Sequence, residues 1–239
     1  DGRHAHGERA VGIPGSRVTI CCVGWTLGTG MLLGVKTVRP DVWLSILPMQ
    51  VVQPLHTLGA IGLLVAGIAT LAAMVVRRVG GCAGPLPVLI APGMGVFMLL
   101  GAAGIVSGNG SGLEYMSWPP VLTALPLVLL VSVACVTAVN LRKLVRLSPE
   151  GAWLLMMGSC LAVLGMIERA LGLGETGPVR ALMIEWHALD TSFAGFNTAL
   201  YGLSILIRVE PGSGRPLRGR WMYSLAVIAL LSTFGHHHY

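Results

Sequence analysis

Long uninterrupted apolar runs follow one another along most of this chain, and they limit the possible folds more than any other feature. A helix needs about 17 to 25 apolar residues to cross a hydrocarbon layer of roughly 30 Å. Six runs meet this requirement, at residues 18–35, 51–76, 86–107, 119–141, 151–173 and 184–207. A seventh run, 221–235, has 15 residues and reaches only about 22 Å as a helix. No run alternates between apolar and polar residues, which excludes a transmembrane β-barrel, so we expect an all-α bundle of about seven transmembrane helices.

The composition also indicates a membrane protein. Hydrophobic residues make up 54% of the chain and charged residues only 11%, whereas a soluble domain carries roughly a quarter charged residues. The net charge of +6 is therefore interpreted first through the excess of Lys and Arg on the cytoplasmic side of membrane proteins. No basic stretch is interleaved with aromatic residues, so nucleic acid is set aside as a partner and membrane lipid is expected.

The basic residues divide unequally between the two ends of the predicted helices. If the N-terminal tail is cytoplasmic, four of the 16 Lys and Arg residues lie on the far side: Lys36, Arg39, Arg169 and Arg180. This bias predicts a cytoplasmic N-terminus. We divide the chain into a cytoplasmic tail, residues 1–17, and one transmembrane domain, residues 18–239. The twelve residues on the cytoplasmic side are Arg3, Arg9, Arg17, Arg77, Arg78, Arg142, Lys143, Arg146, Arg208, Arg215, Arg218 and Arg220.

The N-terminus and the cysteines give little information about function. The chain begins at Asp1 without an initiator Met or a signal-peptide pattern, so we expect either that a leader was removed or that this is a fragment. The five cysteines show no C-x-x-C spacing and lie mostly in apolar runs, and we interpret them as small buried apolar residues.

Ionisable side chains inside the apolar runs are the first candidates for function, because placing them in a membrane is costly. They occur in three places: at His56 in "VVQPLHTLGAIGLL", at Glu185, His187 and Asp190 in "IEWHALDTSFAGFN", and at residues 236–238 in "FGHHHY". Each has a simpler explanation. The first histidine can hydrogen-bond to a neighbouring helix, the second can pair with Trp186 at the interface, and the last three can be the remnant of a purification tag. Glu168 lies near a helix end and is expected to reach water.

Together, these histidines suggest a metal site. Neutral imidazole binds copper or haem iron without bringing net charge into the bilayer. Adjacent histidines point about 100° apart on a regular helix, so two of them share an ion only with a distortion or with the ion between them. His187 lies one helix earlier and is a suitable third ligand, because consecutive helices with a short connection are usually neighbours.

Four stretches resemble the large catalytic subunit of haem-copper oxidases, especially the branch of cbb3-type cytochrome c oxidases and nitric oxide reductases. "QPLHT" (53–57) is similar to the start of the family's second helix, which supplies an axial histidine to the low-spin haem. "GNGSGLEYMSWPP" (108–120) resembles the loop after the third helix. The run from Glu185 stands where the family places its first metal-binding histidine, and "GHHHY" resembles the seventh helix, where two adjacent histidines bind that metal. The 49 positions between His187 and His236 are close to the family spacing.

The resemblance implies a set of cofactors and ligands. His56 would bind a low-spin haem b, and His187 would join His236 and His237 around copper or a non-haem iron, although His237 with His238 fits a phase like that of nitric oxide reductases. Glu114 would help to bind a calcium ion. A high-spin haem would complete the centre, but its proximal ligand and the second axial ligand of the low-spin haem are missing from this chain, because both belong to the tenth of about twelve helices.

The resemblance also implies an activity. The intact protein would be a multi-pass respiratory oxidoreductase of the cytoplasmic (inner) membrane that reduces O2 or NO. Its electrons would come from cytochrome c or quinol, through accessory cytochrome subunits. This chain would be the N-terminal portion, truncated after the seventh helix and unable to form a complete active site alone.

Some family features differ here. The family's residues around the first metal-binding histidine are absent near His187, and Thr191 stands where some branches have a tyrosine. Asp190 is placed to act as the acidic residue beside the non-haem metal of nitric oxide reductases, which favours NO. Two alternatives of other classes remain: a seven-helix transporter or receptor with buried histidines, and a non-catalytic scaffold subunit. A retinal protein is disfavoured because the seventh run has no lysine.

Overall fold

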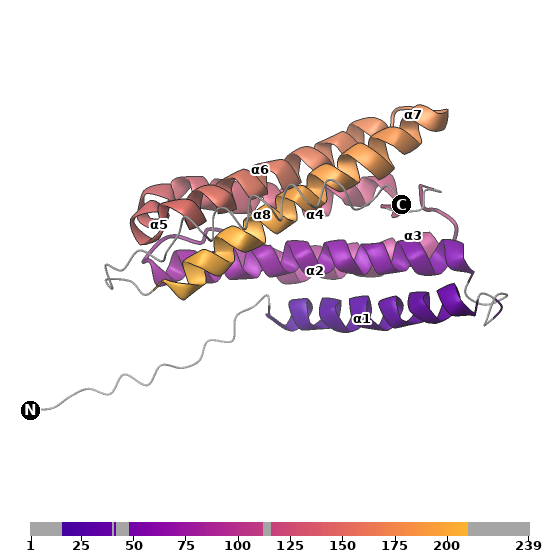
Figure 1. Ribbon diagram of the computed structural model, residues 1–239, viewed down its shortest axis with the longest axis horizontal. Helices are drawn as coiled ribbons and strands as arrows, with labels where there is room; N and C mark the ends of the chain where they lie inside the picture. The colour runs from indigo at the N-terminus through magenta and orange to yellow at the C-terminus, as the bar shows by residue number, and fades with distance from the viewer. Residues whose placement is uncertain (1–15, 40, 42–47, 112–115, 210–239) are drawn as a thin grey trace, which may run out of the picture.

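The computed structural model describes residues 16–39, 41, 48–111 and 116–209, and within these ranges the chain is almost entirely helical, without a β-strand (Figure 1). The elements, in order, are α1 (Ser16–Val38), α2 (Met49–Arg78), α3 (Leu86–Val106), the 3₁₀-helix η1 (Pro120–Thr123), α4 (Ala124–Val139), α5 (Leu141–Leu147), α6 (Pro149–Gly172), α7 (Gly177–Ala181), the π-helix η2 (Leu182–Ala188) and α8 (Leu189–Arg208).

The first six apolar runs of the sequence are helical, as expected. Five helices are long and apolar enough to cross a membrane: α1, α2, α3, the continuous η1–α4 segment and α6. This supports a membrane protein. The sixth run forms η2 and α8, which are not among the helices that are both long and apolar enough to cross a membrane. The seventh run, 221–235, lies outside the described residues.

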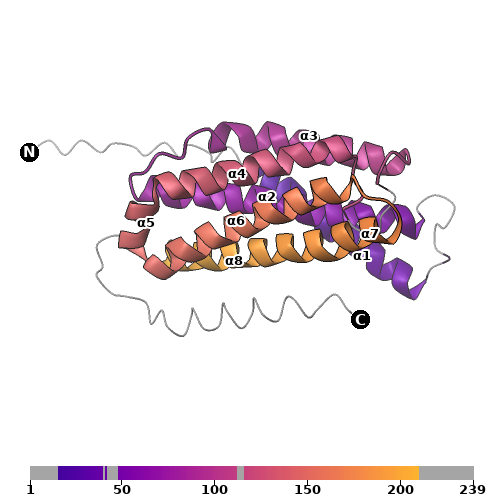
Figure 2. The ribbon, with the colours of Figure 1, turned by 90° about the horizontal axis from the view of Figure 1, so that it is seen from above.

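By their contacts five helices form a ring, in which α2 packs on α3, α3 on α4, α4 on α6, α6 on α8, and α8 on α2, and α2 also contacts α4 across it. Figure 2 shows these helices lying lengthwise beside one another. α1 lies outside this ring and packs against α2 and α3. Its indole at Trp25 donates a 3.0 Å hydrogen bond to the Leu55 carbonyl oxygen, and Gly59 of α2 leaves room for that indole. α2 therefore packs against four helices, α1, α3, α4 and α8.

α6 and α8 approach each other more closely than ordinary side chains permit. A Cβ atom built on Gly158 would lie 2.7 Å from the Ala199 Cα atom, and one on Gly165 would lie 2.6 Å from the Ser192 nitrogen. Such distances are too short for a real contact, so glycine is required at both positions. Small residues that let backbones meet are typical of helix interfaces in membranes. The glycines of this α6–α8 seam are Gly151, Gly158 and Gly165 on α6 and Gly195 and Gly202 on α8, while Gly172 of α6 faces η2.

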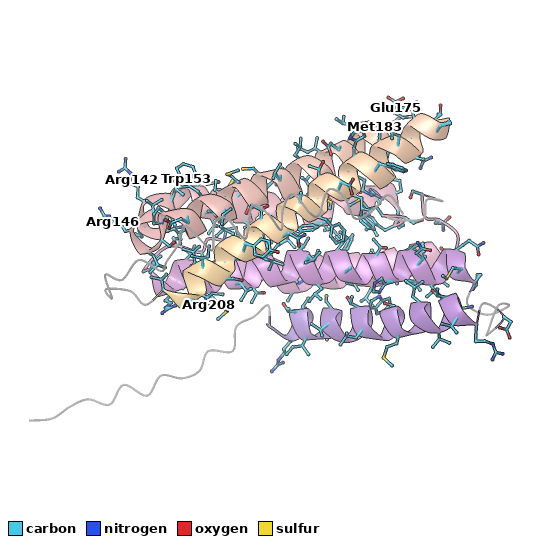
Figure 3. All side chains as sticks on the ribbon, in the orientation of Figure 1. Arg142, Arg146, Trp153, Glu175, Met183 and Arg208 are labelled. Atoms are coloured by element: carbon cyan, nitrogen blue, oxygen red, sulfur yellow. The ribbon has the colours of Figure 1, made fainter. Side chains whose placement is uncertain are left out.

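Basic residues from three helices gather at one end of the bundle, which we call the basic end. The Arg78 guanidinium donates a 2.7 Å hydrogen bond to the Ile207 carbonyl oxygen, and Lys143 Nζ donates one of 2.6 Å to the Gly80 carbonyl oxygen. Figure 3 shows Arg142, Arg146 and Arg208 at this end, with Glu175 and Met183 at the opposite end. The predicted grouping of these charges on one side is therefore present in the fold.

Candidate functional site

His56 lies in the third turn of α2 and faces the flank of α1. Its ring is partly buried, and its Nδ1 atom lies 3.3 Å from the Thr29 hydroxyl oxygen. A Cβ atom on Gly30 would come within 3.1 Å of His56 Cε1, so the missing side chain at that position makes room for the imidazole. α1 therefore supplies both the space for the ring and a polar contact for one of its nitrogens.

The hydrogen bonds of Thr29 favour one tautomer of His56. The Thr29 hydroxyl lies 2.8 Å from the Trp25 carbonyl oxygen and 3.3 Å from that of Thr26, and it has a single hydrogen to donate. When that hydrogen goes to a backbone carbonyl oxygen, the hydroxyl accepts toward His56, an arrangement that places the ring proton on Nδ1. In the neutral ring, Nε2 then keeps its lone pair. Ligating histidines in proteins are commonly held in this way, with the other ring N–H donating to a fixed oxygen.

His56 is the first of several partly exposed residues on one face of α2, a helix that is otherwise largely buried. His56, Ala60, Leu63 and Gly67 recur at spacings of three or four residues, so they share one face of α2, and all four are partly exposed. A Cβ atom on Gly67 would have no heavy atom within 4 Å, and Met74 continues the line with 41% of its surface exposed. We call these five residues the His56 stripe. It is a lengthwise face of α2 on which a flat apolar group or another helix can pack.

The first metal-binding histidine predicted from the sequence lies in an irregular part of the chain. His187 is exposed and belongs to the π-helix η2, and Asp190 follows in the first turn of α8. The Asp190 Oδ1 atom is shielded from solvent and has no hydrogen-bond partner. Short π-helical segments inside longer helices occur frequently at functional sites.

The two described histidines lie at similar depths in the bundle. His56 precedes Arg78 by 22 residues and His187 precedes Arg208 by 21, which places each about 32 Å from the basic end. The C-terminal ends of α2 and α8 meet at the basic end, where Arg78 of α2 donates a hydrogen bond to the Ile207 carbonyl oxygen of α8. In Figure 1, α8 meets α2 near the basic end and diverges from it toward α7. The histidines therefore lie at similar distances along their own helices from the basic end, on helices that diverge away from that end.

No three metal-binding side chains come together within the described ranges of the chain. His236, His237, His238 and Glu114 lie outside these ranges, so the expected copper or iron site and the expected calcium site stay predictions. Glu185 lies in η2 beside His187 in the sequence.

Arg169 is the residue that the sequence-based search for functional groups missed. It was assigned to the polar side of a helix end, yet it is fully buried at the C-terminal end of α6. Its guanidinium donates to the carbonyl oxygens of Met116 and Trp118 and to the Thr123 hydroxyl, and it lies 4.4 Å from the centre of the Trp118 ring. The detectable signal was an arginine inside an apolar run, four positions before its predicted end.

Its neighbour Glu168 is partly exposed; one of its carboxylate oxygens, Oε2, is shielded from solvent and has no hydrogen-bond partner.

Comparison with known proteins gives no relative: no protein-family model, no curated protein and no solved structure matches this chain.

Proposed function

We propose that this chain is the N-terminal part of the catalytic subunit of a respiratory membrane oxidoreductase of the haem-copper oxidase type, which reduces O2 or NO. The observation that supports the proposal best is the environment of His56. This imidazole lies in a candidate membrane span, its Nδ1 atom is 3.3 Å from the Thr29 hydroxyl oxygen, and it begins the partly exposed His56 stripe.

These residues fit an axial ligand to haem b. The Nε2 lone pair of His56 would bind the iron, and the Thr29 hydroxyl would hold the ring in the required tautomer and orientation. Ala60, Leu63 and Gly67 offer a low, apolar surface beside the ligand, which suits a large planar macrocycle. When bound, the haem supplies one-electron transfer between the electron donor, cytochrome c or quinol, and the site of reduction.

The remaining assignments in this proposal come from the sequence. His187, with His236 and His237, would hold copper or a non-haem iron, and three neutral imidazoles leave such an ion an open position for a diatomic substrate. Asp190 would lie beside that metal as the acidic group, in keeping with its solvent-shielded, unpaired Oδ1 atom. Glu114 would contribute to a calcium site. The ligands of the high-spin haem would lie in further helices.

Haem binding by the full chain tests the proposal directly. The chain is produced in the membranes of a haem-synthesising host, purified in detergent and measured by pyridine haemochrome spectroscopy. We expect haem b in the unmodified chain and its loss in His56→Ala. His187→Ala is the matched control: it removes an imidazole at the same depth and should leave haem b bound.

Two results would contradict the proposal: an unmodified chain without haem, or His56→Ala with its haem content unchanged. Either result would favour the transporter, receptor or scaffold alternatives.

A further inference from the structure

α8 has a polar side that faces away from α6. Within the α6–α8 seam, Ser192 and Ala199 of α8 meet Gly165 and Gly158 of α6. Successive residues turn by about 100° around a helix, so the opposite side of α8 carries a line of residues spaced three or four positions apart. None of these residues is buried. We call this line the α8 stripe: Asp190, Phe193, Asn197, Tyr201, Ser204 and Arg208.

The position of the α8 stripe makes its polarity costly. α8 packs along α6, which is long and apolar enough to cross a membrane, so the stripe lies within the depth of the hydrocarbon layer except near its ends. Every member except Phe193 carries a hydrogen-bonding group. At the end far from Arg208, the Asp190 Oδ1 atom is shielded from solvent and has no hydrogen-bond partner. Polar and charged side chains at this depth face protein or water rather than lipid.

The outward faces of the other long helices expose apolar side chains. Met31 on α1 is 75% exposed, Leu99 on α3 is 71% exposed, and Leu171 on α6 is 66% exposed. Lipid chains cover such side chains as well as protein does, because the two are equally apolar. Among the described helices, the α8 stripe is therefore the outward face that most requires a protein partner.

The apolar run 221–235 follows α8 in the chain. α8 ends with Arg208 at the basic end, so the chain leaves the helix there (Figure 3). Residues 210–220, "EPGSGRPLRGR", contain two prolines and three glycines, a composition typical of a turn. Consecutive helices joined by a short connection usually lie side by side and antiparallel.

The length and the polar groups of this segment match the α8 stripe. Asp190 precedes Arg208 by 18 residues, about 27 Å along a helix, and residues 221–238 span about the same length as a helix. A helix that starts level with Arg208 would bring Ser224 level with Ser204, and the histidines at 236–238 level with Asp190. Imidazole N–H groups can donate to that carboxylate. The segment therefore offers hydrogen-bonding groups at levels where the α8 stripe is polar.

We propose that the run 221–235 packs antiparallel against the α8 stripe and covers it within the membrane. This contact follows from exposure, chain length and charge. It needs neither haem nor a metal ion, so it is independent of the ligand assignments in the proposed function.

Cysteine crosslinking in membranes tests the contact. The five native cysteines are replaced by alanine, and Ser204→Cys is combined with Ser224→Cys before oxidation. Trp153→Cys with Ser224→Cys is the matched control, because Trp153 is exposed and, like Ser204, lies four residues from the basic-end terminus of its helix. We expect the crosslinked fraction of the first pair to exceed that of the control roughly tenfold, since docking raises the local concentration of one thiol at the other.

A second pair tests whether the contact extends along the stripe. Phe193→Cys with Gly235→Cys lies near the other end and should crosslink as efficiently as the first pair. Both pairs should also crosslink in a chain that carries His56→Ala, which separates this docking from haem binding.

Three results would overturn the proposal. The first is that neither pair, or only the pair near the basic end, crosslinks within one chain. The second is that the Trp153 control crosslinks equally well. The third is that Ser204→Cys alone forms disulfide-linked dimers more readily than the first pair crosslinks within one chain, which would place a second copy of the protein on the α8 stripe.

Discussion

A single threonine proton influences the chemistry available at His56. Thr29 has one hydroxyl hydrogen, and the Trp25 carbonyl oxygen accepts it at 2.8 Å. This hydrogen bond favours the arrangement in which His56 Nδ1 donates across the 3.3 Å contact. The preferred ring tautomer therefore depends on a residue of another helix, 27 positions earlier in the chain.

Replacing Thr29 tests this relationship. Thr29→Val keeps the shape of the side chain and removes the acceptor, so both ring tautomers become accessible and the ring loses its anchor. We expect affinity for haem to fall by about 10- to 100-fold, as is typical when a partner of a metal-binding histidine is removed. Haemin titration of the purified chain, followed by its absorbance, measures the change.

The control is Thr26→Val on the same helix. The Thr26 hydroxyl also donates to a carbonyl oxygen of its own helix, Cys22 O at 2.8 Å, but none of its recorded hydrogen bonds reaches His56. Haem affinity in this variant should match that of the unmodified chain. Equal affinities for the Thr29→Val and Thr26→Val variants would show that the threonine does not direct the ring.

The sequence predicts some of these residues and not others. His56 is detectable because an imidazole is rare inside an apolar run. The role of Thr29 cannot be detected from the sequence, because it depends on how α1 is rotated against α2. Arg169 is visible as a charge, but its burial follows from the folding of residues 116–123 over the end of α6, a contact across at least 46 positions of sequence. Residues that act through distant backbone atoms carry no local pattern.

At the scale of helices, the apolar runs predict the long elements well. The run expected at 86–107 corresponds to α3 (Leu86–Val106), and the run expected at 151–173 corresponds to α6 (Pro149–Gly172). The start of α6 follows from local chemistry, because the Ser148 side chain accepts a hydrogen bond from the Gly151 N–H and Pro149 occupies the first turn. The π-helix η2 was not predicted, because apolar patterning assumes a regular period of 3.6 residues.

The α6–α8 seam is an interaction that a single substitution should break. Gly158→Leu places a branched side chain where the Ala199 Cα atom would lie 2.7 Å from its Cβ. The helices must then separate, and we expect a loss of stability of about 1–3 kcal/mol or more. Thermal unfolding in detergent, together with a disulfide crosslink engineered between α6 and α8, reports the loss.

Gly28→Leu is the corresponding control. A Cβ atom on Gly28 of α1 meets no heavy atom within 4 Å, so a larger side chain there projects into open space. Its unfolding temperature should stay close to that of the unmodified chain. If the Gly158 and Gly28 variants lose equal stability, the seam is not the cause.

At the scale of the whole molecule, the unequal distribution of charge between the two ends of the bundle predicts how it is oriented in a membrane. Arg78, Lys143 and Arg208 lie at the basic end with the start of α1, while Glu175 lies opposite (Figure 3). Lys and Arg are retained on the cytoplasmic side during insertion, so we expect the basic end to face the cytoplasm. The order of the five ring helices could not be predicted, because apolar runs identify helices but not which of them are neighbours.

Reporter fusions test the orientation. A fluorescent protein that folds only in the cytoplasm should be bright when fused after Arg146, at the basic end, and dark when fused after Glu175. An alkaline phosphatase active only outside the cytoplasm should give the reverse. The opposite pattern for both reporters would place the basic end outside.

The polar character of α8 has a consequence for how the protein is made. α8 is less apolar than the five earlier helices that could span a membrane, and it packs mainly against α6. During synthesis α6 emerges from the ribosome first, and it carries the glycines against which α8 fits. We therefore expect the entry of α8 into the bilayer to depend on α6, so that the two helices insert as a pair.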